Sequence, residues 1–206
     1  MTSLGGVELE FDAWGIDYAY SCTQKCLGAP PGMSPVAISE RALGRIAART
    51  TPVPFSLDLR MLERYWIDRP AVYHHTAPIL HIYALHEALR QVLLEGLEDR
   101  WQRHQNAGRF LQAGLRDRGL ELLADPAHQL DPLTAVRVPD GVDGKRVQRR
   151  VLREHGIEIG GGLGPAAPPM WRIGLMGENA RIDVAERVLE ALDAVLVDEP
   201  VLSGVA

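Results

Sequence analysis

One stretch, residues 21–32, constrains this chain more than any other. It reads Ser-Cys-Thr-Gln-Lys-Cys-Leu-Gly-Ala-Pro-Pro-Gly and follows a strand-like run at residues 15–21. Proline lacks a backbone N–H and glycine weakens helices, so the stretch is predicted to be a loop. It holds Lys25, one of only two lysines in the chain, the other being Lys145. A lysine where a strand enters such a loop can bring its amine to a carbonyl group of a cofactor or substrate.

Length and composition limit the fold and its partners. A chain of 206 residues can bury a substantial core as one large or two small domains. Its net charge of −5 offers no basic surface, so neither nucleic acid nor an anionic membrane is a predicted partner. No apolar run approaches the ~20 residues of a membrane span, and a secretory signal is not recognised. Two cysteines argue against a disulfide scaffold and suit a reducing compartment, so we predict the cytoplasm.

The first part of the chain is predicted to contain strands and helices of a larger α/β unit. Ser39 and Asp58 are placed to cap the helices that follow them, and a short buried strand is predicted over residues 35–39. A long amphipathic helix through residues 82–93 comes next. Gly96 is the expected break after it, because glycine disfavours helix interiors.

The second part has a different order of elements. From Trp101 onward we predict helix, strand, helix, strand, strand, helix, which is typical of a small α/β sandwich with an antiparallel element. The predicted helices cover residues 98–118, 145–155 and 182–197, and the strands cover residues 133–138, 156–159 and 170–175. We therefore divide the chain into residues 1–96 and 97–206, and we expect the residues after Pro200 to form a frayed tail.

Two further segments carry residues suited to ligand binding. Residues 72–78 read Val-Tyr-His-His-Thr-Ala-Pro, and Gly-Gly-Leu-Gly at residues 161–164 precedes Trp-Arg-Ile-Gly-Leu-Met-Gly at residues 171–177. Together with residues 21–32, these segments resemble the class V aminotransferases, in the alanine–glyoxylate and serine–pyruvate or serine–glyoxylate branch. The similarity covers nearly the whole chain, but only the C-terminal half or so of the family's proteins.

The resemblance implies an α/β fold, the C-terminal half of a fold-type I pyridoxal-phosphate-dependent transferase. Residues 1–96 would be the C-terminal portion of the cofactor-binding large domain, and residues 97–206 the small C-terminal domain. It implies pyridoxal 5'-phosphate as the cofactor and a homodimer as the assembly. The implied reaction moves an amino group from a small amino acid, alanine or serine, to the 2-oxo acid glyoxylate or pyruvate.

Five residues match positions with known roles in the family. Lys25 would condense with the cofactor aldehyde and, once displaced by substrate, would move a proton at the substrate Cα. Gln24 would help to bind the cofactor phosphate, and Tyr73 and Thr76 would reach across a dimer to the partner's cofactor. Arg172 would bind the substrate carboxylate, because a planar guanidinium can donate two parallel hydrogen bonds to it.

Other candidate sites have less support. Cys22 and Cys26 flank the lysine, but no second cysteine pair exists, so neither zinc nor any other metal is predicted. The cysteines are expected to be packed and inert. The remaining histidines form no set with ligand spacing and are interpreted as helix-surface or loop residues: His81, His86, His104, His128 and His155.

Two alternatives to a complete aminotransferase remain open. The cysteine desulfurases, which are class V relatives, place a histidine directly before the cofactor lysine; Gln24 stands there in this chain, which favours transamination over a lyase. Family members also bind the cofactor's pyridine nitrogen with an aspartate located just before the segment that resembles residues 2–6. We therefore expect an N-terminally truncated chain. Such a chain could instead be a catalytically inactive fragment, at most a dimerisation or interaction module, with residues 1–96 poorly stable alone.

Overall fold

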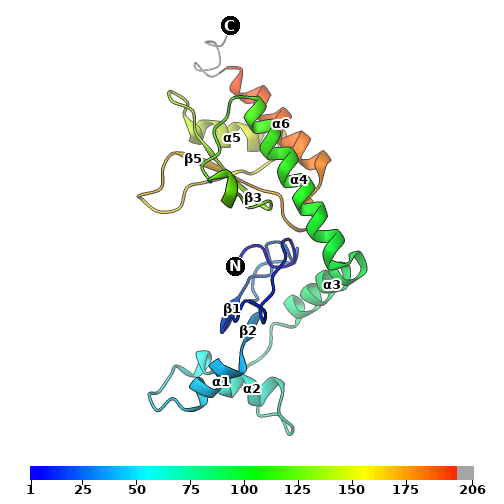
Figure 1. Cartoon of the computed structure of the whole chain (residues 1–206), viewed down its shortest axis with the longest axis vertical. Helices are drawn as coiled ribbons and strands as arrows, with labels where there is room; N and C mark the ends of the chain where they lie inside the picture. The colour runs from blue at the N-terminus through cyan, green and yellow to red at the C-terminus, as the bar shows by residue number, and fades with distance from the viewer. Residues whose placement is uncertain (199–206) are drawn as a thin grey trace.

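The computed structural model describes residues 1–198, so the tail expected after Pro200 lies outside the described residues. One long helix, α4 (Leu97–Asp117), runs through the upper part of the molecule beside α6 (Ile182–Leu196) (Figure 1). Helices α1 (Glu40–Ala47) and α2 (Leu59–Trp66) lie at the opposite end from α6. A ribbon of two strands lies between these two ends.

The ribbon consists of β1 (Tyr18–Tyr20) and β2 (Val36–Ile38), paired antiparallel. The predicted strand over residues 35–39 is therefore present, but the prediction that it is buried was wrong. Val36 and Ala37 are exposed and Ile38 is half-buried. The physical reason is that the sheet has only two strands and contributes no side chain to the hydrophobic core of the chain.

Local sequence signals account for the two helices that follow the ribbon. The Ser39 hydroxyl accepts a hydrogen bond from the Ala42 N–H at 3.1 Å at the start of α1. The Asp58 carboxylate accepts one from the Arg60 N–H at 3.0 Å at the start of α2. Both predicted caps are confirmed. A short 3₁₀ helix, η1 (Phe55–Leu57), precedes α2.

Gly96 separates the two longest helices as predicted. Helix α3 (Ile79–Glu95) ends at this residue, and α4 begins immediately after it. Gly96 has φ of +86°, a conformation that costs a residue with a Cβ atom free energy and that ends a regular helix. Helix α3 buries only Val92, so most of its apolar side chains are exposed among the described residues.

The second half of the chain forms a three-stranded antiparallel sheet. The strand order is β3 (Leu133–Arg137), β5 (Met170–Gly174) and β4 (Gly160–Gly161). Helix α5 (Gly144–His155), whose N-terminus is capped by Asp143, and α6 complete this unit. Two short 3₁₀ helices, η2 (Pro126–His128) and η3 (Gly177–Asn179), lie in its loops.

The predicted strand over residues 156–159 was wrong. Gly156 is in the left-handed conformation, with φ of +67°, and closes α5 by donating its N–H to the Leu152 carbonyl. The chain is therefore still turning where the strand was expected. Pairing with β5 starts only at Gly160, opposite Arg172.

The hydrophobic core lies entirely between Ala107 and Leu196. It joins the inner faces of α4, α5 and α6 to the sheet, and Trp171 on β5 is completely buried within it. The Trp171 indole N–H donates to the Gly144 carbonyl at 3.0 Å, which satisfies its polar atom. Among the described residues, no helix has both the length and the apolar character needed to cross a membrane.

Replacing Trp171 by alanine should lower the free energy of unfolding by about 3–5 kcal/mol, because the variant leaves a large cavity in this core. Trp14 is 57% exposed and provides the matched control. Trp14→Ala should change stability by less than about 1 kcal/mol. Denaturant titrations followed by far-ultraviolet circular dichroism measure both values. Equal losses in the two variants would contradict this description of the core.

Candidate functional site

The loop that carries Lys25 is held in shape by hydrogen bonds between its own residues. The Thr23 hydroxyl donates to the Pro30 carbonyl at 2.6 Å, and the Ala29 N–H donates to the Thr23 carbonyl at 3.0 Å. The Gly28 N–H donates to the Lys25 carbonyl at 2.9 Å, in a turn where Gly28 has φ of +77°. A non-glycine residue adopts that conformation rarely, so the glycine permits the turn. The loop predicted from the sequence is therefore compact and hydrogen-bonded.

Lys25 and Gln24 present their side chains at the surface of this loop. Lys25 is half-buried and Gln24 is exposed, whereas Thr23 and Cys26 on either side are buried. The Lys25 amine makes no hydrogen bond or ion pair with any of residues 1–198. The amine is thus held on a fixed backbone and is free to react with a carbonyl compound.

Tyr73 and Thr76 lie together on the segment that connects α2 to α3. Their hydroxyl oxygens are 2.8 Å apart, and both side chains are exposed. The two histidines between them are half-buried, with their Nδ1 atoms 2.8 Å apart. The His74 ring stacks on Phe55 with ring centroids 4.1 Å apart. The segment is therefore ordered by its histidines and turns a pair of hydroxyl groups outward.

Arg172 lies on β5, where its neighbour is the glycine-rich strand β4. Its Nε donates to the Gly161 carbonyl at 2.6 Å. A Cβ atom on Gly160 would lie 3.4 Å from an Nη atom of Arg172, so the absence of a side chain leaves space for the guanidinium. Within residues 1–198, the two Nη groups make no hydrogen bond or ion pair. They remain available for a planar acceptor such as a carboxylate.

These five residues occupy three different parts of the fold. Lys25 and Gln24 follow β1, Tyr73 and Thr76 precede α3, and Arg172 is on the sheet of the second half (Figure 1). Of these five side chains, only those of Tyr73 and Thr76 hydrogen-bond to each other within the described residues. The loop of Lys25 is nevertheless fixed to the second half by a polar cluster that sequence reasoning missed.

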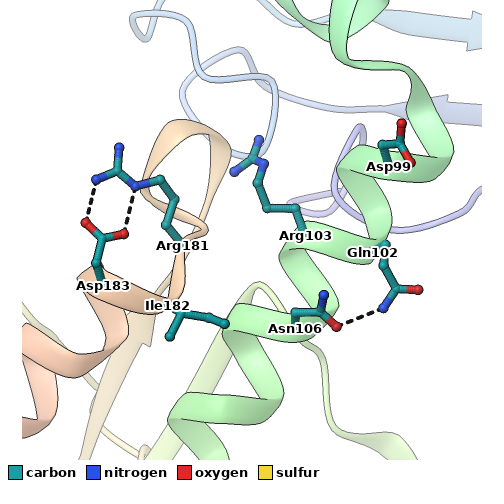
Figure 2. Close-up of a pocket in the computed structure, with 7 residues that line it drawn as sticks. All are labelled: Asp99, Gln102, Arg103, Asn106, Arg181, Ile182 and Asp183. Carbon is teal, nitrogen blue, oxygen red and sulfur yellow. Dashed lines mark hydrogen bonds and ion pairs between the residues drawn. The ribbon is translucent and has the colours of Figure 1, made fainter.

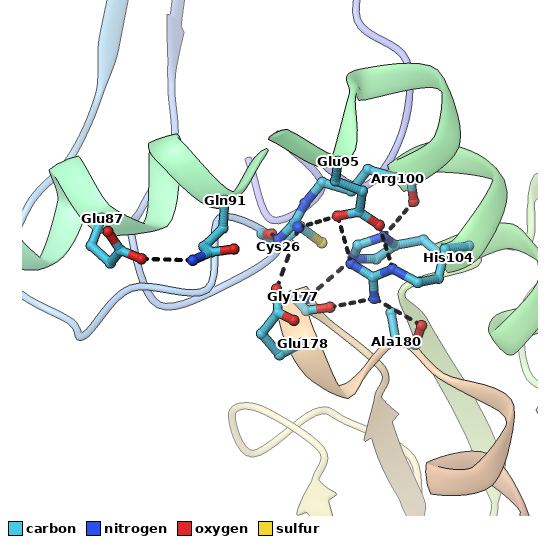
Figure 3. Close-up of polar contacts among 10 residues, drawn as sticks. Cys26, Glu87, Gln91, Glu95, Arg100, His104, Gly177, Glu178 and Ala180 are labelled. Atoms are coloured by element: carbon cyan, nitrogen blue, oxygen red, sulfur yellow. Dashed lines mark hydrogen bonds and ion pairs between the residues drawn. The ribbon is translucent and has the colours of Figure 1, made fainter. Parts of the chain in front are cut away.

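The first member of that cluster is Arg100, whose side chain is 1% exposed. Its Nη2 donates to the Cys26 carbonyl, next to Lys25, at 2.9 Å, and its Nη1 donates to Glu95 at 2.6 Å (Figure 3). A weaker contact of 3.4 Å reaches the exposed Glu178. Hydrogen bonds from Arg103 and then from Arg100 hold the pKa of the Glu95 carboxyl below its usual value.

Arg103 connects the same carboxylate to the turn after β5. It pairs with Glu95 through Nε and Nη2, and its Nη1 donates to the carbonyls of Gly177 and Ala180 at 2.9 and 3.0 Å. Arg103 also lines a shallow hollow between α4 and the start of α6 (Figure 2). Its neighbour Arg181 is paired with Asp183 there, so neither cation is aimed at a ligand.

His104 is completely buried, so the prediction that it is a surface residue was wrong. Its Nδ1 donates to the Arg100 carbonyl at 2.8 Å, and its Nε2 accepts the Gly177 N–H at 3.1 Å. These backbone partners require the neutral ring, and burial lowers its pKa from the ordinary value of 6.5. Arg100 and His104 continue the buried stripe of α4 that includes Ala107 and Leu111. That helical spacing was the available sequence signal.

Of the two cysteines beside Lys25, Cys26 is protected from reaction by its burial. Cys26 is fully buried and free, and burial raises the pKa of its thiol to about 11. A thiol of this kind remains protonated at neutral pH. Cys22 is half-buried, and residues 1–198 contain no group of side chains that could hold a metal ion.

The neutral His104 gives a pH-dependent stability with a definite sign. The unfolded histidine binds a proton below about pH 6.5, while the folded one resists protonation, so stability should fall as the pH drops below that value. The difference amounts to at most about 1.4 kcal/mol for each pH unit. Unfolding free energies measured at about pH 7.5 and 5.5 should differ more in the native chain than in His104→Gln. An identical difference in both chains would contradict a buried neutral ring.

Comparisons with known proteins agree with this arrangement. A family model for class-V aminotransferases matches residues 2–185. The chain is 40% identical over 197 residues to the alanine–glyoxylate aminotransferase of Drosophila melanogaster, covering 94% of this chain and 50% of the relative. It is 38% identical over 216 residues to the (S)-ureidoglycine–glyoxylate transaminase of Bacillus subtilis (strain 168), covering 96% of this chain and 52% of the relative.

A solved structure gives the same result for the fold. The alanine–glyoxylate aminotransferase of Nostoc sp. superimposes with a TM-score of 0.90 at 51% identity, covering 95% of this chain and 52% of that one. This chain therefore spans about half the length of the relatives it matches. The predicted fold-type I α/β class and the cofactor, pyridoxal phosphate, are confirmed for the family. The chain belongs to the class-V aminotransferases.

Proposed function

We propose that this chain supplies the cofactor lysine, part of the cofactor-phosphate site and the substrate-carboxylate site of an aminotransferase. The amino donor would be alanine or serine, and the acceptor glyoxylate or pyruvate. The observation that carries the proposal is the Lys25 amine, which is unpaired among the described residues and lies on a loop closed by its own hydrogen bonds. Relatives named for alanine, ureidoglycine and glyoxylate support the substrate class.

The chemistry of the available groups fits pyridoxal phosphate. The cofactor, when bound, supplies an aldehyde and an electron-accepting ring. Lys25 provides a free amine for the aldehyde, and the Gln24 amide can donate to the phosphate. One hydroxyl of the Tyr73–Thr76 pair donates to the other across 2.8 Å, so the pair offers one outward O–H donor to a phosphate oxygen.

Each residue then has a separate task. Lys25 Nζ would hold the cofactor through its aldehyde, and the same amine, when free, would accept the proton from the substrate Cα. The free Nη groups of Arg172 orient the substrate through its carboxylate. Arginine cannot replace lysine in the proton transfer, because its guanidinium stays protonated at any working pH.

The exposed hydroxyl pair supports a homodimer in which Tyr73 and Thr76 reach the partner subunit's cofactor. Tyr73 is 69% exposed, although it carries a large apolar ring. Apolar side chains on α3 are exposed as well, which suits a helix that a second protein surface covers.

We place the division between the cofactor-binding domain and the small domain at Gly96. We also place the chain in the cytoplasm, where its two free cysteines would stay reduced.

Adding pyridoxal phosphate to the purified chain should produce a visible absorption band that requires Lys25. Lys25→Ala should lose it, because the amine is the group that reacts with the aldehyde. Lys145→Ala removes the other lysine and should keep the band. A band lost equally in both variants, or absent from the native chain, would contradict the proposed function and favour a non-catalytic role.

Alanine should shift the Lys25-dependent absorption band when it binds. Arg172→Lys should raise the alanine concentration that gives half of this shift by roughly tenfold or more, since lysine cannot donate two parallel hydrogen bonds to a carboxylate. Titrations of the absorbance change give the half-saturating concentrations. Alaninol lacks the carboxylate and should act equally on both chains. If Arg172→Lys weakened alanine and alaninol to the same extent, Arg172 would not be the carboxylate site.

A further inference from the structure

The loop of Lys25 and the strand of Arg172 meet at one buried place, which we call the junction. It consists of Gly6, Cys26, Glu95, Arg100, His104 and Gly177. Strand β5, which contains Arg172, ends at Gly174, and the chain reaches the junction three residues later at Gly177. The Lys25 loop enters it through the adjoining residue Cys26 (Figure 3). The two halves of the proposed site are thus connected by a short path.

Backbone segments approach closely at the junction. Gly177 has φ of +59°, and a Cβ atom there would lie 3.0 Å from the Gly28 Cα and 3.5 Å from the Lys25 carbonyl oxygen. At Gly6, a Cβ atom would lie 2.7 Å from the Cys26 sulfur and 2.8 Å from the His104 ring. Neither contact leaves room for an added side chain, so the loop and the turn pack directly on each other.

We propose that Arg100 and His104 are positioning residues that fix the Lys25 amine relative to Arg172. Arg100 binds the loop through the Cys26 carbonyl, and His104 binds the turn through the Gly177 N–H. The two are also joined to each other, since His104 Nδ1 donates to the Arg100 carbonyl. The inference rests on the proposed function, because it assigns Lys25 and Arg172 to one reaction.

The nature of the groups favours positioning over simple packing. Arg100 is almost completely buried, and its Nε has no partner within residues 1–198, so the site costs desolvation energy that an apolar side chain would avoid. In return, its two Nη groups give directional bonds to different segments, Glu95 and Cys26. Directional bonds fix the distance between two segments, which non-directional packing does not.

Hydrogen exchange of the full chain tests this without cofactor. In Arg100→Gln, the Gly28 and Ala29 amides should exchange at least about tenfold faster, because the bond from Arg100 that docks their loop is lost. Amides of β3 and β5 should keep their rates. Arg118→Gln is the matched control, since Arg118, at the C-terminal end of the same helix, pairs with Asp193 and makes no hydrogen bond or ion pair with the loop within residues 1–198.

A second variant, Arg100→Lys, keeps the test valid if Arg100→Gln does not fold. Lysine keeps the charge but reaches only one of the two partners, so the exchange of Gly28 and Ala29 should rise by an intermediate amount. The Lys25-dependent absorption band should form more slowly in the same order: native chain, Arg100→Lys, Arg100→Gln. The inference would be overturned if Arg100→Lys exchanged its Gly28 and Ala29 amides and formed the band at the native rates. It would also be overturned if Arg118→Gln speeded the exchange of these amides as much as Arg100→Gln does. Faster loop exchange in a chain that never shows the band would instead contradict the proposed function.

Discussion

The buried guanidinium of Arg100 is the interaction on which the candidate site depends. It lies in the first turns of α4, directly after the Gly96 break, and its two Nη groups bond to the end of α3 and to the Lys25 loop. Without a partner for each, a buried cation would be strongly unfavourable. The position of Lys25 is therefore coupled to how α3 and α4 meet.

One continuous stripe of buried side chains on α4 packs against the hydrophobic core and also binds the Lys25 loop. Toward its C-terminal end, Leu111 and Leu115 pack in the hydrophobic core with Trp171 of β5. Toward its N-terminal end, the stripe changes from apolar residues to Arg100 and His104, which bind backbone groups of the Lys25 loop and of Gly177. The half of the chain that contains the hydrophobic core thereby holds a loop from the other half, which has few buried apolar residues of its own.

Features set by neighbouring residues were predictable, and features set by distant ones were not. The caps at Ser39 and Asp58 and the break at Gly96 need only local hydrogen bonds and backbone conformation. The roles proposed for Lys25 and Arg172 follow from the resemblance of their short motifs to those of the class V family. The spacing of the buried stripe on α4 includes His104, but its distant partner, the Gly177 N–H 73 residues further along the chain, is not revealed by any local pattern. The exposure of β2 likewise follows from the small number of strands that pair with it.

The junction should make Lys25 more reactive toward pyridoxal phosphate than Lys145, the other lysine of the chain. Borohydride trapping of pyridoxal phosphate on the native chain and on Arg100→Gln, followed by peptide mass spectrometry, compares Lys25 with Lys145 in a single tube. The native chain should be labelled on Lys25 in at least about tenfold excess, and the excess should largely disappear in Arg100→Gln. Equal labelling of Lys25 and Lys145 in the native chain, or an excess that persists in the variant, would contradict this role of the junction.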